Sequence, residues 1–176
     1  MRLPIVIAAA LAFATAAEAK PVVLKPGEAV TLTVDDGGRA IETARGAAWA
    51  LTPFEKAWAR QMTSGELDWA IGPNVAISTS DDERFPVPGP VKPAIVAVKL
   101  VPVGEGNMLF VIENGYSRGF KYRARLRRAD RATATDVCEV MAEKRGFEHW
   151  PYRFDAIEIL DVTLIPWKDG QAPVCE

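Results

Sequence analysis

A serine, two aspartates and a histidine occur in this sequence in the order that a serine hydrolase would use. Residues 115–119 read GYSRG, which matches the G-x-S-x-G nucleophile elbow, and His149 follows with Asp130 and Asp136 between. A helix follows the serine directly in such an elbow, whereas the next residues here, FKYRARL, alternate like a strand. We therefore predict that the chain is not an enzyme. A small hydrolase that uses Ser117 and His149 is the alternative.

An aromatic segment gives a candidate binding site. Residues 146–155 read GFEHWPYRFD and contain the one histidine of the chain. Trp150 and Tyr152, on either side of a proline, could stack on a sugar, or they could belong to the core, where large aromatic side chains contribute most. We predict that Trp150 is part of the core, and that Tyr152 and His149 are more exposed candidate binding residues.

A row of basic residues gives a second candidate surface. In FKYRARLRR, residues 120–128, basic and apolar positions alternate, so the basic side chains share one face of a strand. The four that do so are Lys121, Arg123, Arg125 and Arg127, and Arg118, Arg128 and Arg131 lie near the ends of the row. Such a row is either a solvated face that keeps a strand from aggregating or a site for an anion. The anions considered are phosphorylated lipid heads, acidic glycans, peptidoglycan carboxylates and acidic proteins.

No motif for a cofactor or metal is present. The sequence has no phosphate-cradling glycine loop, and its two cysteines and single histidine lack the spacing of a zinc site. The acidic residues 81–83 lack the spaced oxygen ligands of a calcium loop. We predict no cofactor and no metal, and the net charge of −2 gives no reason to expect nucleic acid as a partner.

The first nineteen residues have the pattern of a signal peptide. Arg2 precedes an apolar stretch, and residues 17–19, AEA, form a small-x-small cleavage site. The apolar stretch is shorter than the roughly 18 to 20 residues that a spanning helix needs. We therefore predict a signal peptide over 1–19 and one β-rich domain over 20–176, which is periplasmic or secreted and does not span a membrane.

Two cysteines fit that location. Cys138 and Cys175 are the only cysteines, and an oxidising compartment would join them. Because Cys175 is the penultimate residue, the predicted disulfide ties the C-terminal tail to the body. On the chain-entropy model such a bridge contributes about 4 kcal/mol to stability.

The elements that must position these residues are mostly strands. Period-two patterns predict a hairpin within 27–44 and a strand over 120–128, and apolar runs predict strands over 94–103, 107–114 and 156–167. Residues 50–65 depart from this period, because Phe54, Trp58 and Met62 recur at helical spacing and Thr52 with Glu55 fits a capping box. One short amphipathic helix is therefore predicted.

These elements predict an all-β fold. The strands over 94–103 and 107–114 are apolar on both faces and must be covered on both, which favours an antiparallel β-sandwich over a small β-barrel. An immunoglobulin-like topology is one version of that sandwich, although its cysteine spacing is missing. We predict a non-catalytic exported protein that binds an anionic envelope component, a glycan or a protein. A structural accessory domain of an envelope complex is a further alternative.

Overall fold

A computed structural model describes residues 20–35, 37–64 and 88–176 of the chain. The predicted signal peptide, 1–19, and the acidic residues 81–83 lie outside the described residues. The elements are, in chain order, β1 (Val22–Leu24), β2 (Glu28–Val34), β3 (Ala40–Ala47), α1 (Pro53–Ser64), β4 (Val96–Val103), β5 (Asn107–Asn114), β6 (Gly119–Arg128), β7 (Arg131–Thr135), β8 (Arg145–Trp150) and β9 (Ala156–Ile165).

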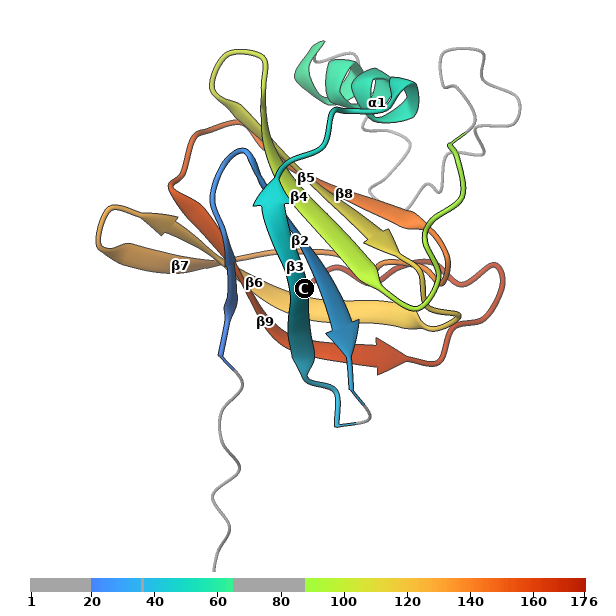
Figure 1. Cartoon of the computed structure of the whole chain (residues 1–176). Helices are drawn as coiled ribbons and strands as arrows, with labels where there is room; N and C mark the ends of the chain where they lie inside the picture. The colour runs from blue at the N-terminus through green and yellow to red at the C-terminus, as the bar shows by residue number, and fades with distance from the viewer. Residues whose placement is uncertain (1–19, 36, 65–87) are drawn as a thin grey trace, which may run out of the picture.

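The strands form two antiparallel sheets that pack face to face (Figure 1). One sheet has the order β1-β9-β6-β7 and the other the order β3-β2-β4-β5-β8. This confirms the predicted β-sandwich, and the sheets do not close into a barrel. The strand order also differs from that of an immunoglobulin domain, whose four-stranded sheet joins the first, second, fifth and fourth strands.

The main core lies between the two sheets and is built from alternate residues of each strand. Leu100 of β4, Phe110 of β5, Phe120 of β6 and Ile157 of β9 are all fully buried there. Strands β4 and β5 are apolar on both faces because α1 covers their outer side. There Ala59 of the helix packs with Leu109 and Val111 of β5 and forms a second, smaller cluster.

The predicted capping box begins α1. The Thr52 amide donates to Glu55 Oε2 at 2.7 Å, and the Glu55 amide donates to Thr52 Oγ1 at 3.2 Å. The aromatic stripe of the helix faces the sheet, since Trp58 stacks on Phe147 of β8 with ring centroids 5.3 Å apart. The stripe is therefore a packing surface.

Part of the candidate binding segment, residues 146–155, is a strand that the sequence patterns did not predict. Strand β8 runs through Gly146 to Trp150 and pairs with β5. Glycine usually weakens a strand, but at this position it makes room for the Val140 side chain. A Cβ on Gly146 would lie 2.7 Å from Val140 Cγ2. The strands β1 and β7 were also missed.

The disulfide between Cys138 and Cys175 is present, as predicted. It joins two short extended segments, and backbone hydrogen bonds link Val137 to Glu176 and Glu139 to Val174 on either side of it. The C-terminal tail is therefore held to the segment between β7 and β8 by both covalent and hydrogen bonds.

Candidate functional site

Four of the five basic residues of β6 share the outer face of the four-stranded sheet, and each of these four lies close to a carboxylate. They are Lys121, Arg123, Arg125 and Arg127. Arg125 Nη2 lies 2.8 Å from Glu158 Oε2, and Arg127 Nε lies 3.2 Å from Glu158 Oε1. The other two pairs are Arg123 with Asp161, and Lys121 with Glu176. This face is therefore neutralised by β9 and by the C-terminal tail, which leaves little free positive charge on it.

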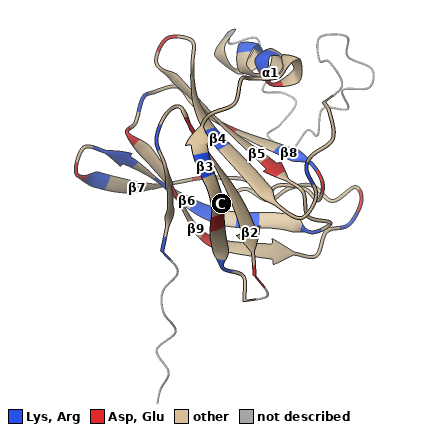
Figure 2. Cartoon of the chain, in the orientation of Figure 1, with Lys and Arg blue, Asp and Glu red and all other residues tan. Residues whose placement is uncertain are grey.

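Two further arginines, Arg128 and Arg131, flank the turn of the β6–β7 hairpin, where Figure 2 shows basic residues on either side of an acidic one, Asp130, and Arg153 lies in the β8–β9 loop. Arg128, Arg131 and Arg153 are exposed, and among the described residues no carboxylate forms an ion pair with any of them. The Arg128 guanidinium lies 5.4 Å from the ring centroid of Tyr152, which is 40% exposed. We call Arg128, Arg131, Tyr152 and Arg153 the arginine–tyrosine surface.

The β8–β9 loop is tied to this hairpin by two hydrogen bonds. The Ala129 amide donates to Asp155 Oδ2 at 2.6 Å, and the Asp155 amide donates to the Arg127 carbonyl at 2.8 Å. Ala129 itself has φ of 52°, in the left-handed region that favours glycine, and the bond to Asp155 helps to hold it there. The surface therefore joins the end of the basic row to the aromatic segment, two regions that the sequence had marked separately.

His149 does not join this surface. Its Nε2 lies 2.9 Å from Asn107 Oδ1, on the outer side of the other sheet, and burial lowers the pKa of the imidazole. Trp150 is 5% exposed, packs edge-on against Phe154 and donates from Nε1 to Thr135 Oγ1, which confirms the prediction that it is part of the core. Strand β8 ends at Trp150, and Tyr152, two residues beyond it, is exposed, which agrees with the prediction that Tyr152 is more exposed than Trp150.

The structure keeps Ser117 and His149 apart. His149 lies opposite Leu109 in β5, whereas Ser117 follows Asn114 at the other end of that strand, roughly 17 Å away along it. Close packing, and not catalysis, explains the two glycines of GYSRG, because neither position has room for a side chain. A Cβ on Gly115 would lie 1.8 Å from the Lys92 carbonyl oxygen. The motif is a tight connection between β5 and β6.

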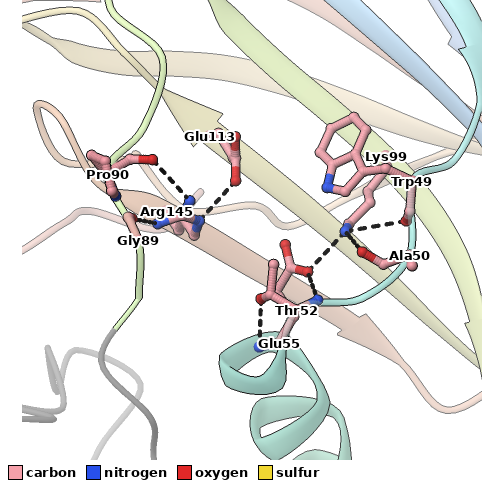
Figure 3. Close-up of polar contacts among 9 residues, drawn as sticks. All are labelled: Trp49, Ala50, Thr52, Glu55, Gly89, Pro90, Lys99, Glu113 and Arg145. Carbon is pink, nitrogen blue, oxygen red and sulfur yellow. Dashed lines mark hydrogen bonds and ion pairs between the residues drawn. The ribbon is translucent and has the colours of Figure 1, made fainter.

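A buried ion pair lies between α1 and the five-stranded sheet (Figure 3). Lys99 Nζ lies 2.8 Å from Glu55 Oε2, and both side chains are fully buried. The ammonium also lies 4.5 Å from the Trp49 ring centroid and is 3.4 Å and 3.5 Å from the carbonyl oxygens of Trp49 and Ala50. Burial lowers the pKa of Lys99, and the hydrogen bond that Lys99 donates to Glu55 opposes that effect. The same carboxylate caps the helix, so this pair fixes α1 on the sheet.

A second ion pair lies beside it on the same face. Arg145 Nε donates to Glu113 Oε1 at 2.8 Å, and its Nη1 donates to the Gly89 carbonyl at 2.5 Å (Figure 3). Arg145 therefore holds the backbone that leads into β4. Nothing in the sequence marked Lys99 or Arg145, because a single charge in an apolar strand does not reveal its partner.

A largely buried carboxyl lies close to the disulfide. Glu148 Oε1 accepts a hydrogen bond from the Cys138 amide at 2.7 Å. Burial raises the pKa of Glu148 to about 7, and the nearby Asp136 adds to that effect. The hydroxyl of Tyr122 is also buried in this region without a hydrogen bond of normal geometry. Glu148 lies in β8, at the edge of the five-stranded sheet, and remains partly exposed.

The described residues offer little else that could hold a small molecule or a metal. A shallow pocket of about 260 Å³ lies between the start of β1, the β2–β3 turn and β9. It is smaller than the range typical of ligand sites, and two of its three charged residues, Arg39 and Asp161, already have partners. Within residues 20–35, 37–64 and 88–176 no group of three or more histidine, cysteine, aspartate or glutamate side chains could bind a metal.

The comparisons with known proteins add no family. No protein-family model, curated protein or solved structure matches this chain. In the part of the chain that the structure describes, no helix combines the length and apolar character needed to cross a membrane. The function must therefore be argued from the chemistry of the site.

Proposed function

We propose that this chain is an exported, non-catalytic protein that binds an anionic partner through the arginine–tyrosine surface. The observation that carries the proposal is the contrast within one strand. Lys121, Arg123, Arg125 and Arg127 each have a carboxylate partner, whereas Arg128 and the neighbouring Arg131 and Arg153 have none among the described residues. The partner sought is an anionic envelope component, either a glycan or a protein.

The chemistry of the surface favours an anion. Arg128 and Arg131 lie directly opposite each other across the hairpin, and two like charges in that position repel unless a counter-ion lies near. Guanidinium groups bind carboxylate and phosphate oxygens with paired hydrogen bonds, which gives such a site both strength and direction. The exposed ring of Tyr152 adds a flat apolar contact beside them.

Two observations support export and a role without catalysis. The disulfide between Cys138 and Cys175 is the kind of bond that persists in oxidising compartments, and the N-terminal sequence has the pattern of a signal peptide. The hydrolase alternative gains no support, because Ser117 and His149 lie at opposite ends of β5. A periplasmic or secreted location is part of the proposal.

The test is a binding titration with two anionic probes. The exported, disulfide-bonded protein is titrated with labelled hexaglutamate and with labelled hexagalacturonate, and an uncharged maltohexaose serves as the control ligand. We expect at least one anionic probe to bind, and its affinity to fall steeply between about 0.05 M and about 0.5 M salt, since exposed charges are screened over that range. We expect maltohexaose not to bind.

A matched pair of variants locates the site. Arg128→Ala/Arg131→Ala and Lys121→Ala/Arg123→Ala each remove two positive charges from the same hairpin or its strand. We expect the first variant to lose about tenfold or more in affinity and the second to lose less than about threefold, because its charges are already paired. Equal losses in both variants, or no binding of either anionic probe to the parent protein, would refute the proposal.

A further inference from the structure

The two sheets end in strands that differ in how their free edges are protected. Strand β3 carries a bulge where its pairing with β2 shifts register, near Thr31 and Leu32. Its Arg45 reaches across to the Val23 carbonyl of β1 at 2.8 Å and to Glu28 at 3.0 Å. Bulges and inward-pointing charges are the usual devices that stop a free edge from pairing with another strand. The β3 edge is therefore protected.

Strand β7 lacks these devices. It reads RATAT, its register with β6 is continuous, and it contains no proline and one charged residue, Arg131, at its start. Four of its five residues are exposed, and the hairpin that it forms with β6 projects beyond the body of the sandwich (Figure 1). A regular, uncovered edge with small side chains is a template for an added strand.

The register of β7 with β6 shows which backbone amides and carbonyls of β7 point away from the sheet. Arg128 and Arg131 face each other across a two-residue turn, so they form the hydrogen-bonded pair that closes the hairpin. Along a strand, the backbone amides and carbonyls of successive residues point to opposite sides. The Arg127 carbonyl fits this alternation, because it points away from β7 and accepts a hydrogen bond from the Asp155 amide. The outward amides and carbonyls of β7 are therefore those of Ala132 and Ala134, and neither has a partner outside the sheet among the described residues.

Charge selects the kind of partner strand. The free edge of β7 begins at Arg131, beside Arg128, and the unpaired guanidinium of Arg153 belongs to the adjoining loop. An extended segment with carboxylates at the end that lies by the hairpin turn would complete the backbone ladder and supply counter-charges together. A second copy paired symmetrically about Thr133 would place Thr135 opposite Arg131 and would offer no carboxylate at that position.

We infer that β7 is a docking edge for an extended acidic peptide segment of a partner protein, which adds as an antiparallel strand. This inference rests on the proposed function and names the class of partner for the same site. The backbone amides and carbonyls of Ala132 and Ala134 form hydrogen bonds with the segment. Its acidic end forms ion pairs with the three arginines, Arg128, Arg131 and Arg153. The small side chains of the strand leave space for a wide range of partner side chains.

The test separates backbone pairing from charge alone. Two peptides of sequence TVTVTEE are compared, whose C-terminal glutamates lie by Arg131 when the peptide pairs antiparallel with β7. One is unmodified and the other is N-methylated on every residue of TVTVT, so that both have the same charge. We expect the unmodified peptide to bind and the N-methylated peptide to bind at least about tenfold more weakly, because it lacks the ladder donors. Analytical ultracentrifugation of the protein without peptide accompanies the titration, and a monomer is expected.

Two variants at one position test the edge from the protein side. Ala134→Pro removes the outward amide and should weaken the unmodified peptide about tenfold or more, whereas Ala134→Ser retains that amide and should bind like the parent. Proline is tolerated where the lost amide faces away from the sheet, and a thermal melt checks that the variant folds. If Ala134→Pro does not fold, the comparison of the two peptides decides alone.

The outcomes divide between the two proposals. Equal binding of both peptides, or binding of hexagalacturonate with no binding of peptide, overturns the docking edge and leaves the anion-binding function standing. A dimer that is abolished by Ala134→Pro assigns the edge to a second copy and also overturns the inference. Absence of binding by every anionic probe refutes the proposed function itself.

Discussion

The outer face of β6 and the tip of its hairpin both carry arginines, but only the first uses them within the fold. On the face, the nearly buried Glu158 lies between Arg125 and Arg127, and Asp161 pairs with Arg123. At the tip, Arg128 contacts only the ring of Tyr152, and Arg131 and Arg153 have no ion-pair partner among the described residues. Charges that a fold has already paired contribute to stability, and those that it leaves unpaired are available to a partner.

The buried pair of Lys99 and Glu55 is the extreme case of a charge used by the fold, and it should show the largest effect. Lys99→Met leaves the Glu55 carboxylate buried without its partner, so we expect the free energy of unfolding to fall by roughly 3–5 kcal/mol in urea titrations. Lys99→Met/Glu55→Gln removes both charges, and glutamine can keep the capping contact with Thr52. The double variant should recover most of the loss, and a loss equal to or greater than that of the single variant would contradict this role.

The pH dependence of stability should report the largely buried Glu148. Its folded pKa of about 7 exceeds the ordinary glutamate value of 4.5, so the folded state binds the proton more tightly than the unfolded state does. Stability from this group should therefore fall as the pH rises from about 4.5 to about 7, by roughly 3 kcal/mol in all. Glu148→Gln should flatten that part of the urea-midpoint profile. A profile as steep as that of the parent would show that another group is responsible.

Glu158→Gln converts paired arginines into unpaired ones and so tests the boundary between the two regions. Arg125 and Arg127 are about half exposed, so the stability loss should be only about 1 kcal/mol. The variant should also bind hexaglutamate about twofold or more tightly, because two cations next to the tip lose their internal partner. Weaker binding would mean that Glu158 organises the tip and does not simply neutralise the face.

Arg128→Ala/Arg131→Ala should have the smallest effect on the fold. Both side chains are exposed and lie outside the core, so we expect the free energy of unfolding to change by less than about 0.5 kcal/mol in either direction. A thermal or urea melt of the same protein sample that is used for binding gives this value. A loss of several kcal/mol would place these arginines in the group that the fold uses.

The sequence was sufficient to predict the sandwich, its helix and the disulfide because these depend on local patterns. The nearly continuous apolar runs of β4 and β5, the Thr52–Glu55 capping box and a single pair of cysteines each have one simple interpretation. The pairing of charges could not be predicted in this way. Whether an arginine on β6 is free depends on which carboxylate of β9 or of the tail lies opposite, and this is set by the register between distant segments.

The candidate surface was predicted only in part for the same reason. Tyr152 was correctly placed among the exposed residues, and Arg128 and Arg131 were noted at the end of the basic row. The loop that carries Tyr152 lies beside these arginines because Asp155 forms hydrogen bonds with the hairpin, and no local sequence pattern predicts those bonds. Strand β8 was missed because glycine and proline usually interrupt strands, whereas this strand runs through Gly146 and ends just before Pro151.

The most direct test of the central claim is amide-resolved hydrogen exchange with and without the unmodified TVTVTEE peptide. If the free hairpin is the binding surface, the amides of Ala132 and Ala134 should become protected when the peptide is added, and those of the β3 edge should not change. The N-methylated peptide should give little protection at either edge. Protection along β3, or binding of the unmodified peptide with no protection at Ala132 and Ala134, would contradict the account.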